Sequence, residues 1–174
     1  MTRPTFRYMP MRPLLLAASL VGSLALATLA IGPAAAQSSA PATAAVSTAI
    51  APAAKEAVAV VDAFAAALGN GQLDIARQLM APDAVVVANG QVLGQRDDYI
   101  DGPAKADAAA LRTVQRALLR REARASSDVT WVLSEKRVSA AAQGPSEVVM
   151  ETMLLARTAS GWKITQIHWS GRHG

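Results

Sequence analysis

The feature that most constrains the fold is a change of hydrophobic period after residue 120. Before it, apolar residues recur every three or four positions, as they do on one face of a helix. After it, short turn sequences separate segments rich in β-branched residues, and we expect strands over 122–126, 128–140, 147–158 and 162–170. Helices followed by a run of strands predict an α+β domain, because alternating βαβ units would mix the two periods along the chain.

The first half of the chain is expected to supply helices and one hairpin. Helical periodicity covers 55–68, 73–80, 96–100 and 104–119. Asn89-Gly90 separates two apolar runs, and this dipeptide predicts a tight hairpin because both central residues of the turn need positive φ. The four-residue spacing of Arg112, Arg116 and Arg120 favours a solvated face at the end of the fourth helix over an anion-binding stripe.

The N-terminus has the pattern of a secretory signal. Three arginines precede an uncharged apolar run over 14–31, and the small residues Ala34-Ala35-Ala36 follow a Gly-Pro pair. The alternative is a retained membrane anchor, but this run is short and rich in Ala, Ser, Thr and Gly. We therefore expect a cleavable signal over 1–36, cut after Ala36, and a periplasmic or secreted protein with no membrane attachment after cleavage.

Two further segments follow the signal. Residues 37–54 are uncharged and rich in Ala, Pro and Ser, which predicts a flexible tether. The remaining residues, 55–174, are enough for one domain and too few for two.

Composition narrows the classes of function. The chain has 17 Lys and Arg against 13 Asp and Glu, and three of the basic residues lie in the signal. The rest carries a surplus of a single positive charge, which argues for no nucleic-acid partner. Cysteine is absent, so disulfides and a lipid-modified Cys are excluded. The sequence has no Gly-rich phosphate loop, no nucleophile elbow and no paired acidic motif, so we expect no cofactor and no metal.

The C-terminal run resembles the closing strand of nuclear-transport-factor-2-like domains. It begins Gly161-Trp162-Lys163-Ile164 and ends His168-Trp169-Ser170-Gly171, and it is most similar to the SnoaL-like and kinase-association-domain branch. The resemblance covers about residues 55–172. It implies a strongly bent antiparallel sheet wrapped around the N-terminal helices into a cone, with a pocket on the concave side. Members use that pocket as an enzyme site of ketosteroid isomerase, dehydratase or cyclase type, as a ligand site or only as a core, and many dimerise through the sheet.

The segment 147–157 bears on assembly, because both of its alternating faces are apolar. Its apolar residues are Val148, Met150 and Leu154 on one face and Val149, Met153 and Leu155 on the other. A strand of this kind is usually buried on both sides. The helices can cover one face, and we expect a homodimer formed sheet to sheet to cover the other.

His168 is the first candidate for a pocket residue. It shares strand alternation with Trp162 and Ile164, so Gln166, His168 and Ser170 are expected to line the deeper end of the pocket if those two face the core. A histidine there can act as a general base, donate a hydrogen bond to an anion or ligate a metal. The alternative is a structural histidine bonded to the backbone or to a neighbouring glutamate.

Three further residues complete the predicted site. Glu151 lies in the middle of the most apolar strand, where a charge must be paired or functional. Lys136 and its neighbour Arg137 lie on opposite faces of the preceding strand, so one of them points inward. Tyr99 either caps the mouth of the pocket or packs in the core.

These residues support three hypotheses. The first is an exported small-molecule-binding protein that holds a small polar or anionic organic ligand near His168. The second is an enzyme of isomerase, dehydratase or hydrolase type with His168 and Glu151 as acid and base. The third is a dimerising module whose pocket is filled by its own side chains. Whether the chain is an enzyme is left open.

Overall fold

A strongly curved, open sheet of seven strands organises the domain, in the order β1-β4-β5-β6-β7-β2-β3. The computed structural model describes residues 46–140 and 145–173, so the predicted signal over 1–36 lies outside the described residues. The strands are β1 Ser47–Ile50, β2 Met80–Ala88, β3 Gln91–Gln95, β4 Gln115–Ser126, β5 Val129–Ser139, β6 Ser146–Thr158 and β7 Gly161–His173.

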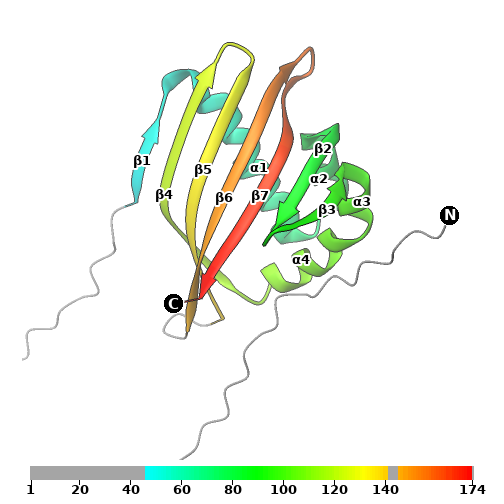
Figure 1. Cartoon of the computed structure of the whole chain (residues 1–174), viewed down its shortest axis with the longest axis vertical. Helices are drawn as coiled ribbons and strands as arrows, with labels where there is room; N and C mark the ends of the chain where they lie inside the picture. The colour runs from blue at the N-terminus through cyan, green and yellow to red at the C-terminus, as the bar shows by residue number, and fades with distance from the viewer. Residues whose placement is uncertain (1–45, 141–144, 174) are drawn as a thin grey trace, which may run out of the picture. The chain divides into compact units, whose positions relative to one another are not determined.

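Four helices and one short 3-10 turn lie before the long strands in the sequence. They are η1 Pro52–Ala54, α1 Lys55–Asn70, α2 Leu73–Leu79, α3 Arg96–Asp101 and α4 Pro103–Leu111. Figure 1 shows α1 crossing behind the sheet and α2, α3 and α4 gathered on the side of β2 and β3. Strands β4 to β7 form an antiparallel meander, while β1 joins β4 and β2 joins β7 in parallel. The predicted α+β class with a bent sheet is confirmed.

The local signals explain most of the element boundaries. Gly71 ends α1 in the left-handed conformation, with φ of 71°, and its N–H bonds to the carbonyls of Ala67 and Leu68. Asn89 and Gly90 both have positive φ and form the predicted hairpin turn between β2 and β3.

The core lies between α1 and one end of the curved sheet. Val61 and Phe64 on α1 are buried with Val132, Met153 and Ile164 from the facing strands. Helix α1 therefore has the expected apolar stripe, and the stripe covers the concave face of β5, β6 and β7 at this end.

The fourth helix is shorter than the predicted helix over 104–119. Helix α4 ends at Leu111, and β4 begins at Gln115. Both the amide and the hydroxyl of Thr113 bond to the carbonyl of Ala110, which turns the chain out of the helix. The next residues gain a continuous antiparallel ladder with β5, so Arg116 and Arg120 lie on a strand and the predicted helical arginine face is wrong.

The predicted tether is wrong for residues 47–54. Strand β1 pairs with β4, the amide of Ala51 bonds to the carbonyl of Ala123 at 3.0 Å, and η1 leads directly into α1. Composition suggested flexibility, but the edge of β4 offers backbone groups that a short uncharged segment can pair with. Residues 37–45 of the predicted tether lie outside the described residues.

Salt bridges link α2 to α3. Arg77 on α2 donates hydrogen bonds to Asp97 and Asp101 on α3. A hydrogen bond from Arg96 is the largest cause that holds the pKa of the Asp97 carboxyl below its ordinary value, and Arg77 adds to it. This surface network fixes the short helix that carries Tyr99.

Candidate functional site

One level of the concave face is polar across four consecutive strands. Arg121, Ser134, Glu151 and Trp169 come from β4, β5, β6 and β7, and each is the direct cross-strand neighbour of the next. We call these four residues the polar row. Arg121 is 6% exposed, Ser134 0% and Glu151 5%, although charged side chains are seldom this deeply buried without a partner.

Glu151 is the best-connected member of the polar row. The Nζ of Lys136 donates to its Oε1 at 2.7 Å, and the Nε1 of Trp169 donates to its Oε2 at 2.9 Å. Lys136 is the next inward-facing residue of β5 after Ser134, and its side chain is 16% exposed. The pair is therefore an almost buried ion pair in which each carboxylate oxygen has a donor.

Arg121 occupies the other end of the row. Its Nη1 donates to the Oδ1 of Asp62 on α1 at 2.6 Å, and its Nε donates to the hydroxyl of Ser134 at 3.2 Å. The Asp62 side chain is 58% exposed, whereas that of Arg121 is 7% exposed. The guanidinium therefore lies just beneath the surface, between α1 and β4.

Tyr99 lies behind Trp169. The two ring centroids are 5.9 Å apart, and the Tyr99 hydroxyl donates to the Oδ2 of Asp107 on α4 at 2.9 Å. Tyr99 is fully buried. This position agrees with the packing alternative and not with a cap at the mouth of a pocket.

The polar row marks a boundary on the concave face. On one side of it the inward-facing Val132, Met153 and Ile164 are 0% exposed. On the other side the inward-facing Leu118, Val138 and Val149 are only half-buried. The concave face is thus closed by the core at one end and opens to the surface at the other, with Lys136 on the open side of the row.

His168 is not on the concave face, because β7 contains a bulge. Ile164 pairs with Leu155 and Gln166 pairs with Leu154, so Thr165 is an extra residue between them. One extra residue reverses the inward and outward alternation of everything that follows it.

The bulge moves three predicted pocket residues to the outer face. Gln166, His168 and Ser170 alternate outward, His168 is exposed, and its cross-strand neighbour is Thr152. The prediction that they line the pocket is wrong. Glu151 and His168 lie on adjacent strands but on opposite faces, so the predicted acid–base couple does not form.

The structure brings two of the predicted site residues together. It also adds three residues that the sequence analysis did not identify. Glu151 and Lys136 meet directly, while Arg137 is exposed. Trp169 was missed because the alternation was counted through the bulge without a break. Arg121 was missed because the strand that contains it was predicted to begin at residue 122. Ser134 lies within the predicted strand 128–140, but a serine in a strand gives no sequence signal of its own.

Within residues 46–140 and 145–173, no three His, Asp or Glu side chains are placed as ligands for a metal ion. No helix in the same ranges is both long and apolar enough to cross a membrane.

Comparison with known proteins places this geometry in a family. The family model of the SnoaL-like domain matches residues 57–172. No curated protein sequence matches the chain. A solved structure from Shewanella frigidimarina, provisionally described as a ketosteroid isomerase, is similar with a TM-score of 0.64 and 28% identity over 70% of this chain and 99% of that one.

Two further structures show the same fold at lower identity. One is from Streptomyces avermitilis and is provisionally described as a dehydratase of the NTF2-like family, with 18% identity, a TM-score of 0.57 and coverage of 70% of this chain and 97% of that one. The other is an NTF2-like protein with a cystatin-like fold from Novosphingobium aromaticivorans, with 15% identity, a TM-score of 0.55 and coverage of 67% and 79%.

Proposed function

Because the chain belongs to the SnoaL-like domain family, we propose that it is an exported protein that binds a small organic molecule at the open end of its concave face. The observation that carries this proposal is the Lys136–Glu151 ion pair at the boundary between the closed core and the open end. A buried ion pair generally contributes less to stability than apolar side chains of the same size would. Its position therefore suggests a role in binding.

The surroundings of Lys136 define the class of ligand. An ammonium group has three donors, and Glu151 accepts one of them. The remaining donors suit a carboxylate or another polar acceptor on a ligand. The half-buried Leu118, Val138 and Val149 offer apolar contact to the carbon part of the same molecule. We therefore propose a small ligand with an anionic or polar group and an apolar body.

The test is native mass spectrometry of the processed protein, purified from its own host. We expect excess mass from a retained ligand, and a cut after Ala36 would support export. The variant combining Lys136→Met with Glu151→Leu should lose that excess mass, whereas Arg124→Gln, an exposed change on β4, should keep it. Equal retention by both variants would show that the ligand does not bind at Lys136.

A second candidate function is proton transfer on a bound substrate, with Glu151 as the base. It is favoured by the similarity to the structure provisionally described as a ketosteroid isomerase, and by the position of a carboxylate on the concave face. A screen with ketosteroids would test it. Turnover that disappears in Glu151→Gln while the protein stays folded would support this candidate, and turnover that persists in this variant would exclude Glu151 as the base.

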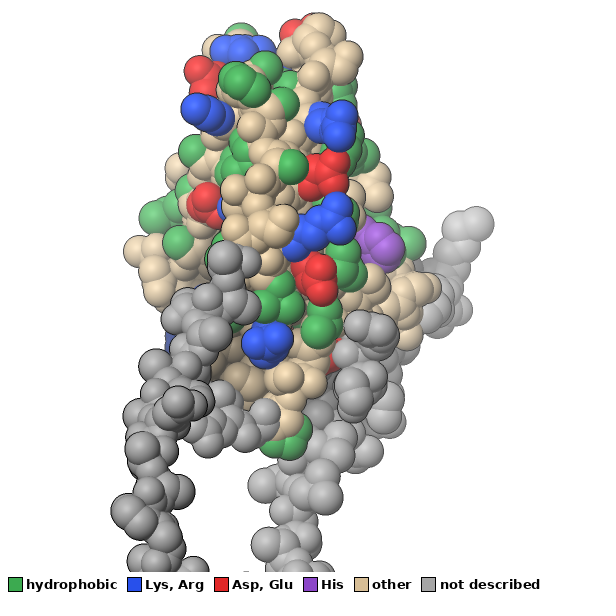
Figure 2. All heavy atoms as spheres, turned by 90° about the vertical axis from the view of Figure 1, so that its left-hand side faces the viewer, with side chains coloured by type: hydrophobic (Ala, Val, Ile, Leu, Met, Phe, Trp, Pro, Cys, Tyr) green, Lys and Arg blue, Asp and Glu red, His purple; other side chains and the backbone are tan. Residues whose placement is uncertain are grey.

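We also propose that the outer face of the sheet forms a homodimer. Trp131, Leu133, Met150 and Leu154 alternate outward on β5 and β6 and are only half-buried. Trp131 and Leu154 are direct cross-strand neighbours, so the apolar residues are contiguous. Along the neighbouring edge basic and acidic side chains alternate (Figure 2), and on β4 Glu122 pairs with Arg120 and Arg124. An apolar centre bounded by charge is the usual anatomy of an interface.

Leu154→Lys is expected to convert the dimer to a monomer, because it places a charge in the apolar centre. We expect the dissociation constant to rise by about 30-fold or more, as for the loss of an interface hot spot. Light scattering after size exclusion measures the mass. Ile75→Lys is the matched control, since Ile75 is 46% exposed on α2, a helix that packs against α1. An unmodified protein that is already monomeric would refute the dimer.

A further inference from the structure

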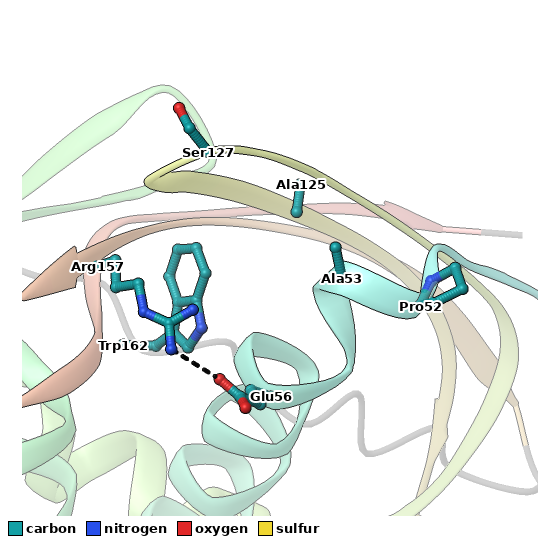
Figure 3. Close-up of a pocket in the computed structure, with 7 residues that line it drawn as sticks. All are labelled: Pro52, Ala53, Glu56, Ala125, Ser127, Arg157 and Trp162. Carbon is teal, nitrogen blue, oxygen red and sulfur yellow. Dashed lines mark hydrogen bonds and ion pairs between the residues drawn. The ribbon is translucent and has the colours of Figure 1, made fainter.

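A pocket lies at the closed end of the concave face, away from Lys136. It has a volume of about 310 Å³ and is bordered by the start of α1 and by the ends of β4, β6 and β7. Figure 3 shows Arg157 and Trp162 on one side of it and Glu56 on α1 facing them. Pro52 and Ala125 supply apolar wall.

Trp162 in this pocket carries a donor without an acceptor. The residue is 6% exposed, and its buried Nε1 has no hydrogen-bond partner. Buried indole N–H groups usually find one. Within the described residues, the hydroxyl of Thr130 is the other buried side-chain group without a hydrogen-bond partner. Thr130 is the cross-strand neighbour of Ala125, which lines this pocket. The two buried polar groups without partners therefore lie at the same end of the sheet.

Two oppositely charged side chains, Arg157 and Glu56, lie beside this donor and form a weak ion pair. Arg157 donates to the Oε2 of Glu56 at 3.3 Å, and the two side chains are 53% and 71% exposed. The guanidinium carbon lies 5.5 Å from the centre of the Trp162 ring. Exposed ion pairs contribute little to stability, so the pair opens readily. Arg157 can then leave the ring and give access to Nε1.

We propose that this pocket binds a small zwitterion of the α-amino-acid type. Its carboxylate accepts from Arg157 and from the N–H of Trp162, and its ammonium group donates to Glu56. One weak ion pair is exchanged for two, and the unpartnered indole N–H gains an acceptor. A simple anion would leave Glu56 without a partner and a simple cation would leave Arg157 without one, so both charges are needed on one ligand.

The pocket is separate from the proposed ligand site. Arg157 and Glu151 both face inward on β6, but the buried Met153 and Leu155 lie between them. Each site also has its own tryptophan, because Trp169 bonds to Glu151 while Trp162 lines this pocket. A measurement that resolves the indole groups can therefore tell the two sites apart.

The experiment follows the indole N–H signals of the nitrogen-15-labelled processed protein in two-dimensional NMR. The chain has three tryptophans, and Trp162→Phe and Trp169→Phe assign their signals. The probes are L-alanine and L-leucine, each added to about 10 mM, which detects dissociation constants near 1 mM. We expect the Trp162 signal to shift with either probe while the Trp169 signal stays in place.

The control probes are acetate and methylammonium at the same concentration, and both should shift the Trp162 signal far less. Arg157→Gln and Glu56→Gln should each weaken the amino-acid response at least tenfold, and Arg124→Gln should leave it unchanged. These substitutions are on the surface, so folding is kept. A Trp162 signal that does not move, that moves equally with acetate, or that still responds in both variants would overturn the proposal.

Discussion

Replacing Lys136 alone with methionine is expected to lower the free energy of unfolding by about 3–5 kcal/mol. The substitution leaves Glu151 buried, with the indole of Trp169 as its remaining donor. An uncompensated buried charge is among the most destabilising changes that a single substitution can make. Urea unfolding followed by circular dichroism measures the effect.

The same measurement on the double variant separates stability from function. Lys136→Met combined with Glu151→Leu removes both charges and fills the space with apolar atoms. We expect it to be as stable as the unmodified protein or more stable, because the desolvation cost of the pair is gone. Lys105→Met, at an exposed position on α4, should change stability by no more than about 0.5 kcal/mol. A double variant as unstable as Lys136→Met would show that the pair stabilises the fold outright.

Deleting Thr165 is expected to leave the domain folded with β7 in the same register. Ile164 would be followed directly by Gln166, so Gln166 and His168 would still face outward and Ile167 and Trp169 would still face inward. The deletion removes the bulge, the local bend that it gives to β7 and the hydrogen bond from the threonine hydroxyl to the carbonyl of Leu154. We expect the free energy of unfolding to fall by about 1–3 kcal/mol, measured by urea unfolding.

Thr165→Ala is the control for this deletion. It keeps the bulge and removes only the hydrogen bond from the threonine hydroxyl to the carbonyl of Leu154, so we expect a loss of about 1 kcal/mol. Near-ultraviolet circular dichroism reports whether the tryptophans remain packed. A deletion variant that unfolds, while Thr165→Ala stays folded, would show that the fold depends on the bend of β7 at the bulge.

The fold was predictable because its main elements carry strong local signals. The stripe of α1, the Asn89-Gly90 turn and the turns between the long strands all depend on neighbouring residues in the sequence. The resemblance in the closing strand also pointed to the family that the match over 57–172 shows. Strand β1 was missed because its formation depends on the edge of β4, which is distant in the sequence.

The sequence predicted only part of the site, and the main reason is the extra residue Thr165 in β7. Glu151 was found because a charge in an apolar strand needs a partner, and Lys136 because one of two adjacent basic residues must face inward. His168 was misplaced because a bulge has no clear sequence signal, yet it reverses every later residue of β7. An error of this kind affects every residue between the bulge and the end of the strand.

The polar row is built as a single rung, with one side chain from each of four strands. Its backbone is held by the ladder alone, so any one of the four positions can change without altering the path of its neighbours. In such a row the side chains can differ while the backbone ladder stays the same. The chemistry of the concave face can therefore change in evolution without a change in the path of the strands, provided that Glu151 and its partner Lys136 change together, while the apolar core keeps the domain folded.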